Sequence, residues 1–230
     1  MTAQATDHRF YGRRKGHPLR AWSQMLVDNL LPKLRLTLPA AGPLDLGAVF
    51  PDPSRPLWLE IGFGRGEHLA AQAMAHPQVN FIGCEPFLNG VAGLLQEIDA
   101  KGLKNIRIFD EDARRLLPRL ADASVDRLFL LYPDPWPKVR HHKRRFVSRD
   151  NLNEIARALR PGGAFLFATD HMDYCAWTLR EVLGHGAFSW TAEEPEDWRR
   201  PPAGWVATRY EQKALAAGGR AVYLAFQRRP

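Results

Sequence analysis

The sequence has few cysteines, no long apolar run and no internal repeat, and each absence excludes a class of protein. Two cysteines, Cys84 and Cys175, among 230 residues are too few for a disulfide framework or an all-cysteine zinc site, so we expect a reducing, cytoplasmic location. No stretch reaches the 18 apolar residues of a membrane span. The first ten residues lack an apolar core, so we also expect no secretory signal.

What is present is ordinary globular composition with an uneven distribution of charge. The chain is 45% hydrophobic and 25% charged, which disfavours disorder, collagen and coiled coil. Residues 1–20 hold five basic residues against one acid, and residues 138–149 hold six with no acid, so these two segments together exceed the net charge of +7. Focused positive charge attracts polyanions such as nucleic acids. For residues 1–20 alone, a solvated tail is an equal alternative.

Prolines and glycines divide the chain into an N-terminal segment and a larger domain. Five prolines and two glycines lie in residues 39–56, a density that we expect to exclude helices and central strands and to form a linker. Before it, apolar residues from Trp22 to Leu31 recur at helical spacing and predict a short amphipathic helix. We therefore predict a basic arm, helix and linker in residues 1–56 and the main domain in residues 57–230.

Short apolar runs alternate with helical patterns from residue 57 onward. This alternation predicts βαβ units and a mostly parallel sheet of α/β class, closed by an antiparallel C-terminal strand. The predicted strands are 57–61, 79–83, 106–109, 125–131, 164–168, 187–190 and 221–226, and the predicted helices are 67–75, 89–101, 113–120, 151–159 and 174–183.

A glycine-rich loop follows the first predicted strand. Its glycines, Gly62, Gly64 and Gly66, allow the backbone to approach a ligand closely. The spacing Gly-x-Gly-x-Gly differs from the dinucleotide fingerprint, which favours a cofactor without a pyrophosphate and disfavours a nicotinamide dehydrogenase. Glu85 ends the second strand, where a carboxylate can accept hydrogen bonds from ribose hydroxyls, and Asp112 follows the third strand in the same way.

Local structure offers an alternative for each of these residues. The glycines can serve only the turn, Glu85 can end a strand, and Asp112 can cap a helix. Glu60, at the end of the first strand, can hold a cationic ammonium or fix the loop backbone. Three acids around one glycine loop are harder to explain by turns alone. The combination resembles the Rossmann-like, class I methyltransferases that use S-adenosylmethionine, a likeness that covers about residues 57–170.

The segment after the fourth strand combines rigidity with charge. Prolines at 133, 135 and 137 fix the backbone and present Asp134 and Trp136 from a stiff frame. A basic run, residues 140–145, follows directly. Tyr-Pro-Asp-Pro-Trp-x-Lys-x-x-His-x-Lys-Arg-Arg, with the glycine loop and a late Thr-Arg-Tyr-Glu, resembles the bacterial tRNA (guanine-N7-)-methyltransferase family, which methylates a variable-loop guanine of tRNA. The N-terminal basic arm is also similar to that of the family.

The resemblance implies S-adenosylmethionine as cofactor, tRNA as partner, and a set of site residues. It implies Asp134 as the catalytic residue and a cofactor-binding set of Glu60, Gly62, Gly64, Glu85, Asp112 and Asp134. It implies substrate contacts by Lys138, Asp170, Thr208, Arg209, Tyr210 and Glu211. The basic run adds Arg144 and Arg145 as expected phosphate contacts.

Some of these residues also fit structural roles. Thr208 and Glu211 have the spacing of a helix capping box, and Asp170 precedes a predicted helix that it could cap. No metal-binding constellation is evident, and we expect His141 and His142 to be phosphate contacts rather than ligands.

Guanine N7 carries a lone pair and no proton, so its methylation needs no general base. We therefore expect Asp134 to orient the base, and Trp136 or Tyr132 to stack on it. Alternatives are an amino-group methyltransferase acting on another nucleic acid and a catalytically silent RNA-binding subunit. We expect no membrane association and no obligate protein partner, with the chain acting as a monomer or homodimer.

Overall fold

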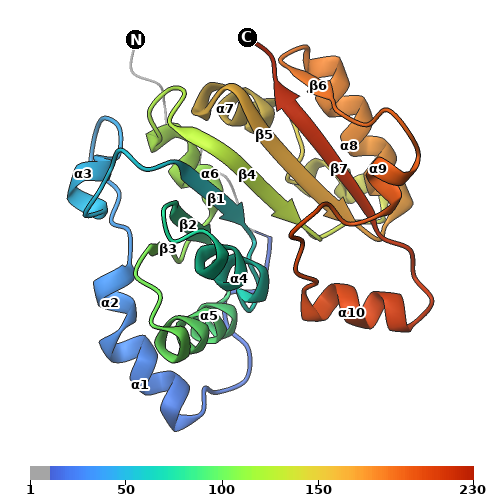
Figure 1. Cartoon of the computed structure of the whole chain (residues 1–230). Coiled ribbons are helices and arrows are strands. Elements are labelled where there is room, and N and C mark those ends of the chain that lie inside the picture. The colour runs from blue at the N-terminus through green and yellow to red at the C-terminus, as the bar shows by residue number, and fades with distance from the viewer. Residues whose placement is uncertain (1–10) are drawn as a thin grey trace.

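A seven-stranded sheet forms the centre of the structure, which is a computed structural model and describes residues 11–230. The strand order is β3-β2-β1-β4-β5-β7-β6 (Figure 1). β1 to β5 pair in parallel, whereas β7 runs antiparallel to both β5 and β6. The predicted α/β class with an antiparallel C-terminal strand is confirmed. The strands are β1 (Leu57–Ile61), β2 (Asn80–Cys84), β3 (Ile106–Phe109), β4 (Val125–Leu131), β5 (Leu159–Thr169), β6 (Phe188–Trp190) and β7 (Val222–Arg228).

Helices cover both faces of the sheet, as crossovers between parallel strands require (Figure 1). On one face, Leu69 and Leu94 pack in a core that also holds Leu26 from the N-terminal helix. On the other face, Ile155 and Val182 share a second core. The helices are α1 (Ala21–Asn29), α2 (Leu31–Leu34), α3 (Leu46–Val49), α4 (Glu67–Ala75), α5 (Leu88–Lys101), α6 (Ala113–Leu116), α7 (Arg149–Ala158), α8 (Met172–His185), α9 (Glu196–Arg199) and α10 (Arg209–Ala216), with 3-10 helices η1 (Leu117–Arg119) and η2 (Val139–Arg144).

Two predicted boundaries differ from the structure by more than two residues. In place of one helix over 113–120, the α-helix α6 ends at Leu116, and the 3-10 helix η1, which has a proline in its first positions, follows directly. The fifth strand begins at Leu159 rather than 164, directly after α7, because the residues up to Gly163 are accommodated at a register shift between β4 and β5. Within this shift Gly162 has φ of 76°, a left-handed conformation suited to glycine.

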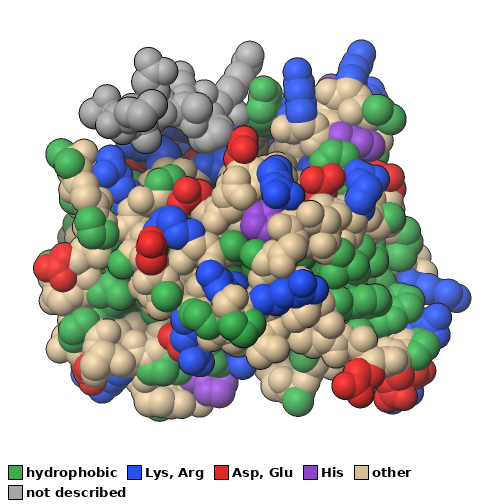
Figure 2. Space-filling view, turned by 90° about the horizontal axis from the view of Figure 1, so that it is seen from above, with side chains coloured by type: hydrophobic (Ala, Val, Ile, Leu, Met, Phe, Trp, Pro, Cys, Tyr) green, Lys and Arg blue, Asp and Glu red, His purple; other side chains and the backbone are tan. Residues whose placement is uncertain are grey.

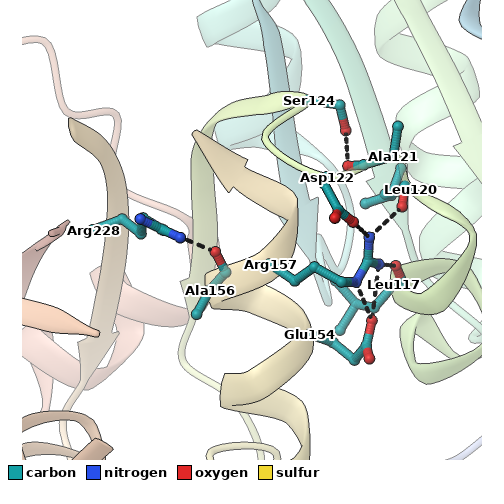
Figure 3. A network of polar contacts seen from close by, with 9 residues as sticks. All are labelled: Leu117, Leu120, Ala121, Asp122, Ser124, Glu154, Ala156, Arg157 and Arg228. Carbon is teal, nitrogen blue, oxygen red and sulfur yellow. Dashed lines mark hydrogen bonds and ion pairs between the residues drawn. The ribbon is translucent and has the colours of Figure 1, made fainter. Parts of the chain in front are cut away.

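The connection from η1 to β4 is fastened to α7 by one arginine (Figure 3). Arg157 donates from Nη1 to the Leu120 carbonyl at 2.7 Å and to Asp122 at 2.6 Å, and from Nη2 to the Leu117 carbonyl at 2.8 Å. Burial alone would lower the pKa of Arg157, but its hydrogen bonds with Asp122 and Glu154 outweigh that effect and raise it. The contact fixes the start of β4, whose other end carries the Asp134 turn.

The proline-rich segment 39–56 packs on the main core. The expectation that its composition excludes any helix is wrong, because α3 forms one turn with Asp45 accepting a hydrogen bond from the Gly47 amide. Leu44 and Phe50 are buried in the core shared with β1 and α7. The predicted helix α1 does pack on α5. The division between 1–56 and 57–230 stays a prediction.

The surface seen from above in Figure 2 carries Lys and Arg side chains dispersed among acidic and hydrophobic ones. Basic side chains therefore do not form one continuous patch on that face. Across residues 11–230, no helix is long and apolar enough to cross a membrane.

Candidate active site

A cavity of about 690 Å³ opens where β1, β2 and β4 end, at the carboxyl edge of the sheet. Open α/β sheets bind their ligands at this edge, where strand order reverses. Here the order reverses between β1 and β4. Of the predicted site residues, those that line the cavity are Gly62, Glu85, Asp112, Asp134, Arg144, Arg145 and Tyr210.

The glycine loop follows β1 at this edge of the sheet, and its first glycine, Gly62, lines the cavity. Gly62, Gly64 and Gly66 have φ of 72°, 56° and 81°, values that side-chain-bearing residues rarely adopt. A Cβ on Gly62 or Gly64 would meet no atom within 4 Å, so these two positions require glycine for backbone conformation and leave open space beside them. Gly90 of α5 packs so closely on the loop that a Cβ there would stand 2.3 Å from the Gly64 carbonyl oxygen.

Glu85 ties the glycine loop to the start of α5. Its carboxylate accepts hydrogen bonds from the Gly64 amide and the Phe87 amide, both at 2.9 Å. Burial, with a smaller contribution from the charge of Asp134, raises the pKa of Glu85 to about 6 against the lowering effect of these two amides. A carboxylate offers about four acceptor positions. Two remain for a ligand in the cavity, which fits a pair of ribose hydroxyls.

Asp112 lines the cavity and also caps α6. Its Oδ1 accepts from the Arg114 amide at 3.0 Å, and the Arg114 side chain binds the same carboxylate. The capping alternative is confirmed by this contact. A cofactor contact by Asp112 stays a prediction.

Glu60 points away from the cavity. Side chains alternate along a strand, and Glu60 falls on the same face as Trp58, toward α4, whereas Leu59 and Ile61 face the other core. There the Glu60 carboxylate, 2% exposed, lies 2.7 Å from Nδ1 of His68. This placement supports the role of fixing the loop and the following helix. Direct contact between Glu60 and a cofactor stays a prediction.

The turn after β4 carries Asp134 in an unusual backbone. Tyr132 has φ of 49° and Trp136 has φ of 44°, and neither is glycine. Each left-handed residue of this kind costs about 1–3 kcal/mol and is found mostly at functional sites. Between them, with a proline on each side, Asp134 is exposed and lines the cavity. The predicted rigid presentation of Asp134 agrees with this geometry.

The basic segment after the turn divides into exposed and buried members. Lys138 is exposed and lies outside the cavity lining. Arg144 stands over the rings of Tyr11 and Trp136, at 4.4 and 4.9 Å from their centroids. Arg145, in contrast, is only 2% exposed. Arg145 lines the cavity but is enclosed by protein, and a phosphate contact by it stays a prediction.

The C-terminal segment contributes one side chain to the cavity. Tyr210 lines it, with its hydroxyl 3.3 Å from Asp170 and its ring 5.4 Å from that of Tyr132. Arg209 is exposed. Asp170 does not cap the next helix, because His171 is the N-cap of α8.

Thr208 and Glu211 form the capping box of α10, as the structural alternative predicted. Glu211 is buried and accepts hydrogen bonds from Trp205 Nε1, at 2.9 Å, and from the Tyr223 hydroxyl. Both side chains are therefore occupied within the fold. Substrate contacts by Thr208 and Glu211 stay predictions, and their observed bonds hold α10 where it presents Tyr210.

The end of the N-terminal arm also reaches the cavity, which the sequence did not indicate. Tyr11, Gly12 and Arg13 line it. The following residues are held on α5, where Gly16 donates to Asn89 Oδ1 and Asn89 donates to the His17 carbonyl, both at 2.8 Å. Both cysteines are buried and free, and Cys84 is among the residues that line the cavity. No group of metal-ligating side chains occurs within residues 11–230.

The fold and the cavity define a class I methyltransferase. A family model described as "putative methyltransferase" matches residues 54–224. The 16S rRNA methyltransferase KamB superposes with a TM-score of 0.57 at 20% identity, over 76% of this chain and 88% of that one. A precorrin-6y C5,15-methyltransferase from Geobacter metallireducens gives a TM-score of 0.50 at 12% identity, over 90% and 88%. These likenesses establish the fold, and the cofactor of this class is S-adenosylmethionine.

Closer relatives identify the family. The chain is 54% identical to a tRNA (guanine-N(7)-)-methyltransferase of Rhodospirillum rubrum over 227 residues, which covers 97% of this chain and 89% of that protein. It is 53% identical to the enzyme of the same name from Rhizobium meliloti, over 98% and 97% of the two chains. The chain belongs to the tRNA (guanine-N(7)-)-methyltransferase family, as the motifs predicted.

Proposed function

We propose that this protein transfers the methyl group of S-adenosylmethionine to N7 of a variable-loop guanine in tRNA, forming N7-methylguanine. The observation that carries the proposal is the placement of Asp134. It stands exposed on a stiff turn at the mouth of a cavity whose other wall holds Glu85. Relatives at about half identity, named for this reaction, support the assignment.

The residues around the cavity fit the cofactor. Glu85 keeps two free acceptor positions for ribose hydroxyls after binding the Gly64 and Phe87 amides. A Cβ on Gly62 or Gly64 would stand in open space, and Gly62 lines the cavity. When bound, S-adenosylmethionine supplies an electrophilic methyl group on a sulfonium. Glu85 and the glycine loop would hold its nucleoside, close to the Asp134 turn.

Asp134 acts as an orienting residue. Guanine N7 has an in-plane lone pair, so the chain need not remove a proton from that atom. The Asp134 carboxylate can accept hydrogen bonds from guanine N1–H and the exocyclic amine, which adenine cannot donate in the same pattern. Its negative charge also offsets the positive charge that the purine gains on methylation.

Tyr210 and Asp170 extend the base-binding wall. The Tyr210 ring is exposed beside Tyr132 and is oriented by the contact of its hydroxyl with Asp170. An extruded base stacks readily on such a ring. Trp136 is already engaged by Tyr11 and Arg144, so we favour Tyr210 for stacking. The exposed cations Lys138 and Arg209 and the partly exposed Arg144 are suited to phosphates.

Labelled-methyl transfer to unmodified tRNA tests the proposal. We expect label in tRNA, and strand cleavage at one variable-loop guanosine after borohydride and aniline treatment, which reports N7-methylguanine. Label at an exocyclic amine would resist this cleavage and would instead establish the amino-group alternative. Binding of S-adenosylmethionine without any transfer would favour a silent RNA-binding subunit.

The variant Asp134→Asn separates orientation from cofactor binding. We expect a large loss of turnover while the affinity for S-adenosylhomocysteine is retained, because the amide side chain would lack the charge and one of the two acceptor oxygens. Unchanged turnover would refute the orienting role. We further propose that the protein acts in the cytoplasm, where tRNA is found, as a monomer or homodimer without an obligate partner.

A further inference from the structure

Two consecutive arginines end the basic segment and lie in opposite environments. Arg144 is partly exposed between the rings of Tyr11 and Trp136. The Arg145 side chain has no accessible surface. The two arginines therefore have different roles, and phosphate binding does not account for the buried Arg145.

Arg145 connects the Asp134 turn to α8. Its Nε donates a hydrogen bond to the carbonyl oxygen of Pro135, the residue directly after Asp134, at 2.9 Å. Its Nη2 donates to the carboxylate of Asp173 in the first turn of α8. The contact with Arg145 lowers the pKa of Asp173, so this carboxylate stays ionised. One planar guanidinium thus fixes the turn to a helix more than thirty residues away in sequence.

Two aromatic rings form a cage around the guanidinium. The centroids of Tyr174 and Trp177 lie 5.0 and 5.1 Å from its central carbon, within the range of cation–π attraction. The rings are themselves held, because Trp177 Nε1 donates to the Val147 carbonyl at 2.7 Å and the Val147 amide donates to the Tyr174 hydroxyl at 3.3 Å. The cage restricts Arg145 to one position and one plane.

Packing alone does not account for a cation here. Burying a guanidinium is unfavourable, and an apolar side chain of similar volume often stabilises a protein as well or better. The carboxylate partner, Asp173, is 57% exposed, which weakens the ion pair. What Arg145 offers that an apolar residue lacks is a rigid set of donors directed at two acceptors at once.

We propose that Arg145 is a positioning residue for methyl transfer. By holding the Pro135 carbonyl it sets the turn between the left-handed residues Tyr132 and Trp136, and thereby the location of the Asp134 carboxylate. The inference rests on the proposed function, in which Asp134 orients the base. Because its side chain has no accessible surface, we do not expect Arg145 to bind a tRNA phosphate.

Single-turnover methylation, tRNA binding and chemical rescue test this role together. Arg145→Lys retains the charge, but a single ammonium cannot reproduce the fork to Pro135 and Asp173. We expect its methylation rate to fall at least about tenfold. We expect its tRNA affinity, its affinity for S-adenosylhomocysteine and the salt dependence of tRNA binding to match those of the wild type. Millimolar guanidinium should restore part of the rate of Arg145→Ala, whereas methylammonium should not.

Two matched variants define the comparison. Arg144→Ala removes the neighbouring, partly exposed cation and should lower the salt slope of tRNA binding by about one. Arg180→Met removes a cation that lies 4.8 Å from the same Trp177 ring but makes no contact with the turn, and its methylation rate should be unchanged. A salt slope reduced by about one in Arg145→Met would overturn the proposal, since it would make Arg145 a phosphate contact. A wild-type rate in Arg145→Lys would do the same.

Asp173→Ala keeps the test decisive if the Arg145 variants fail to fold. Asp173 is exposed enough for its loss to be tolerated, yet the change frees one end of the Arg145 contact. We expect a slower methylation rate at unchanged tRNA affinity, and a wild-type rate would contradict the role. If the wild-type protein itself transfers no methyl group to guanine N7, the proposed function fails first. Normal wild-type transfer with fully active Arg145→Lys and Asp173→Ala variants refutes the positioning role alone.

Discussion

Replacing Glu85 by Gln tests the electrostatics of the cofactor site, because Glu85 is a buried acid held by two backbone amides. Burial raises its pKa from 4.5 to about 6. The folded protein therefore binds this proton more tightly than the unfolded chain does. Stability is lost as the pH rises from about 4.5 to about 6 and then stays level. A shift of that size corresponds to about 2 kcal/mol.

Glu85→Gln removes this titration. The free energy of unfolding of the wild type, measured relative to the variant, should fall by about 2 kcal/mol between about pH 4 and pH 7. The variant also loses one amide hydrogen bond, which lowers its free energy of unfolding by about 1 kcal/mol at every pH. This constant offset does not change how the difference between the wild type and the variant depends on pH. Urea unfolding at pH intervals measures both curves. Parallel curves over this range would refute the assigned burial of the Glu85 charge.

The Glu85 carboxylate should also make ligand affinity depend on pH, with affinity rising as the pH rises, whereas the stability of the protein falls. The ionised form of Glu85 offers the acceptors that ribose hydroxyls need, so the affinity for S-adenosylhomocysteine should weaken as the pH falls below about 6, by up to about tenfold per pH unit. Calorimetric titration of Glu85→Gln should show weaker binding with no such dependence. An unchanged affinity in the variant would remove Glu85 from the cofactor site.

Two further pairs of variants test the frame around the site. Gly90→Ala places a Cβ against the Gly64 carbonyl and should lower the affinity for S-adenosylhomocysteine at least about tenfold by displacing the glycine loop. Gly184→Ala, in open space on α8, should leave this affinity unchanged and stabilise the protein by up to about 1 kcal/mol. Equal affinities in the two variants would contradict the close packing of Gly90 on the loop. Arg157→Met leaves two carbonyls without their donor and should cost about 2–3 kcal/mol, or roughly 5–10 °C in Tm. Arg160→Met loses one ion pair, in which the arginine side chain is 56% exposed, and should cost less than about 1 kcal/mol. A thermal scan that shows equal losses for the two variants would refute the contrast.

Local patterns in the sequence predicted the parts of the structure that depend on neighbouring residues. The strands formed where short apolar runs stood between helical patterns. The capping box of Thr208 and Glu211 was readable because its two residues lie within one helical turn. The glycine loop was located from its composition in the same way, and the structure shows a positive φ at each of its three glycines.

Features that depend on tertiary contacts were not readable. β1 is buried on both faces, so its hydrophobic pattern could not show that Glu60 faces His68 rather than the cavity. Arg144 and Arg145 are chemically identical, and the aromatic cage that buries Arg145 comes from α8. The wall formed by residues 11–13 likewise arises because Asn89 holds the arm on α5.

The most direct test of the central claim compares two bases at the target position in a single-turnover assay. Inosine keeps N7 and N1–H but lacks the exocyclic amine that Asp134 is expected to bind. The wild type should methylate tRNA carrying inosine at the target position roughly 10–100-fold more slowly than tRNA carrying guanosine. This is the effect expected when one hydrogen bond to a charged group is lost. In Asp134→Ala the two rates should be nearly equal. A variant that keeps the full wild-type preference for guanosine would contradict the account.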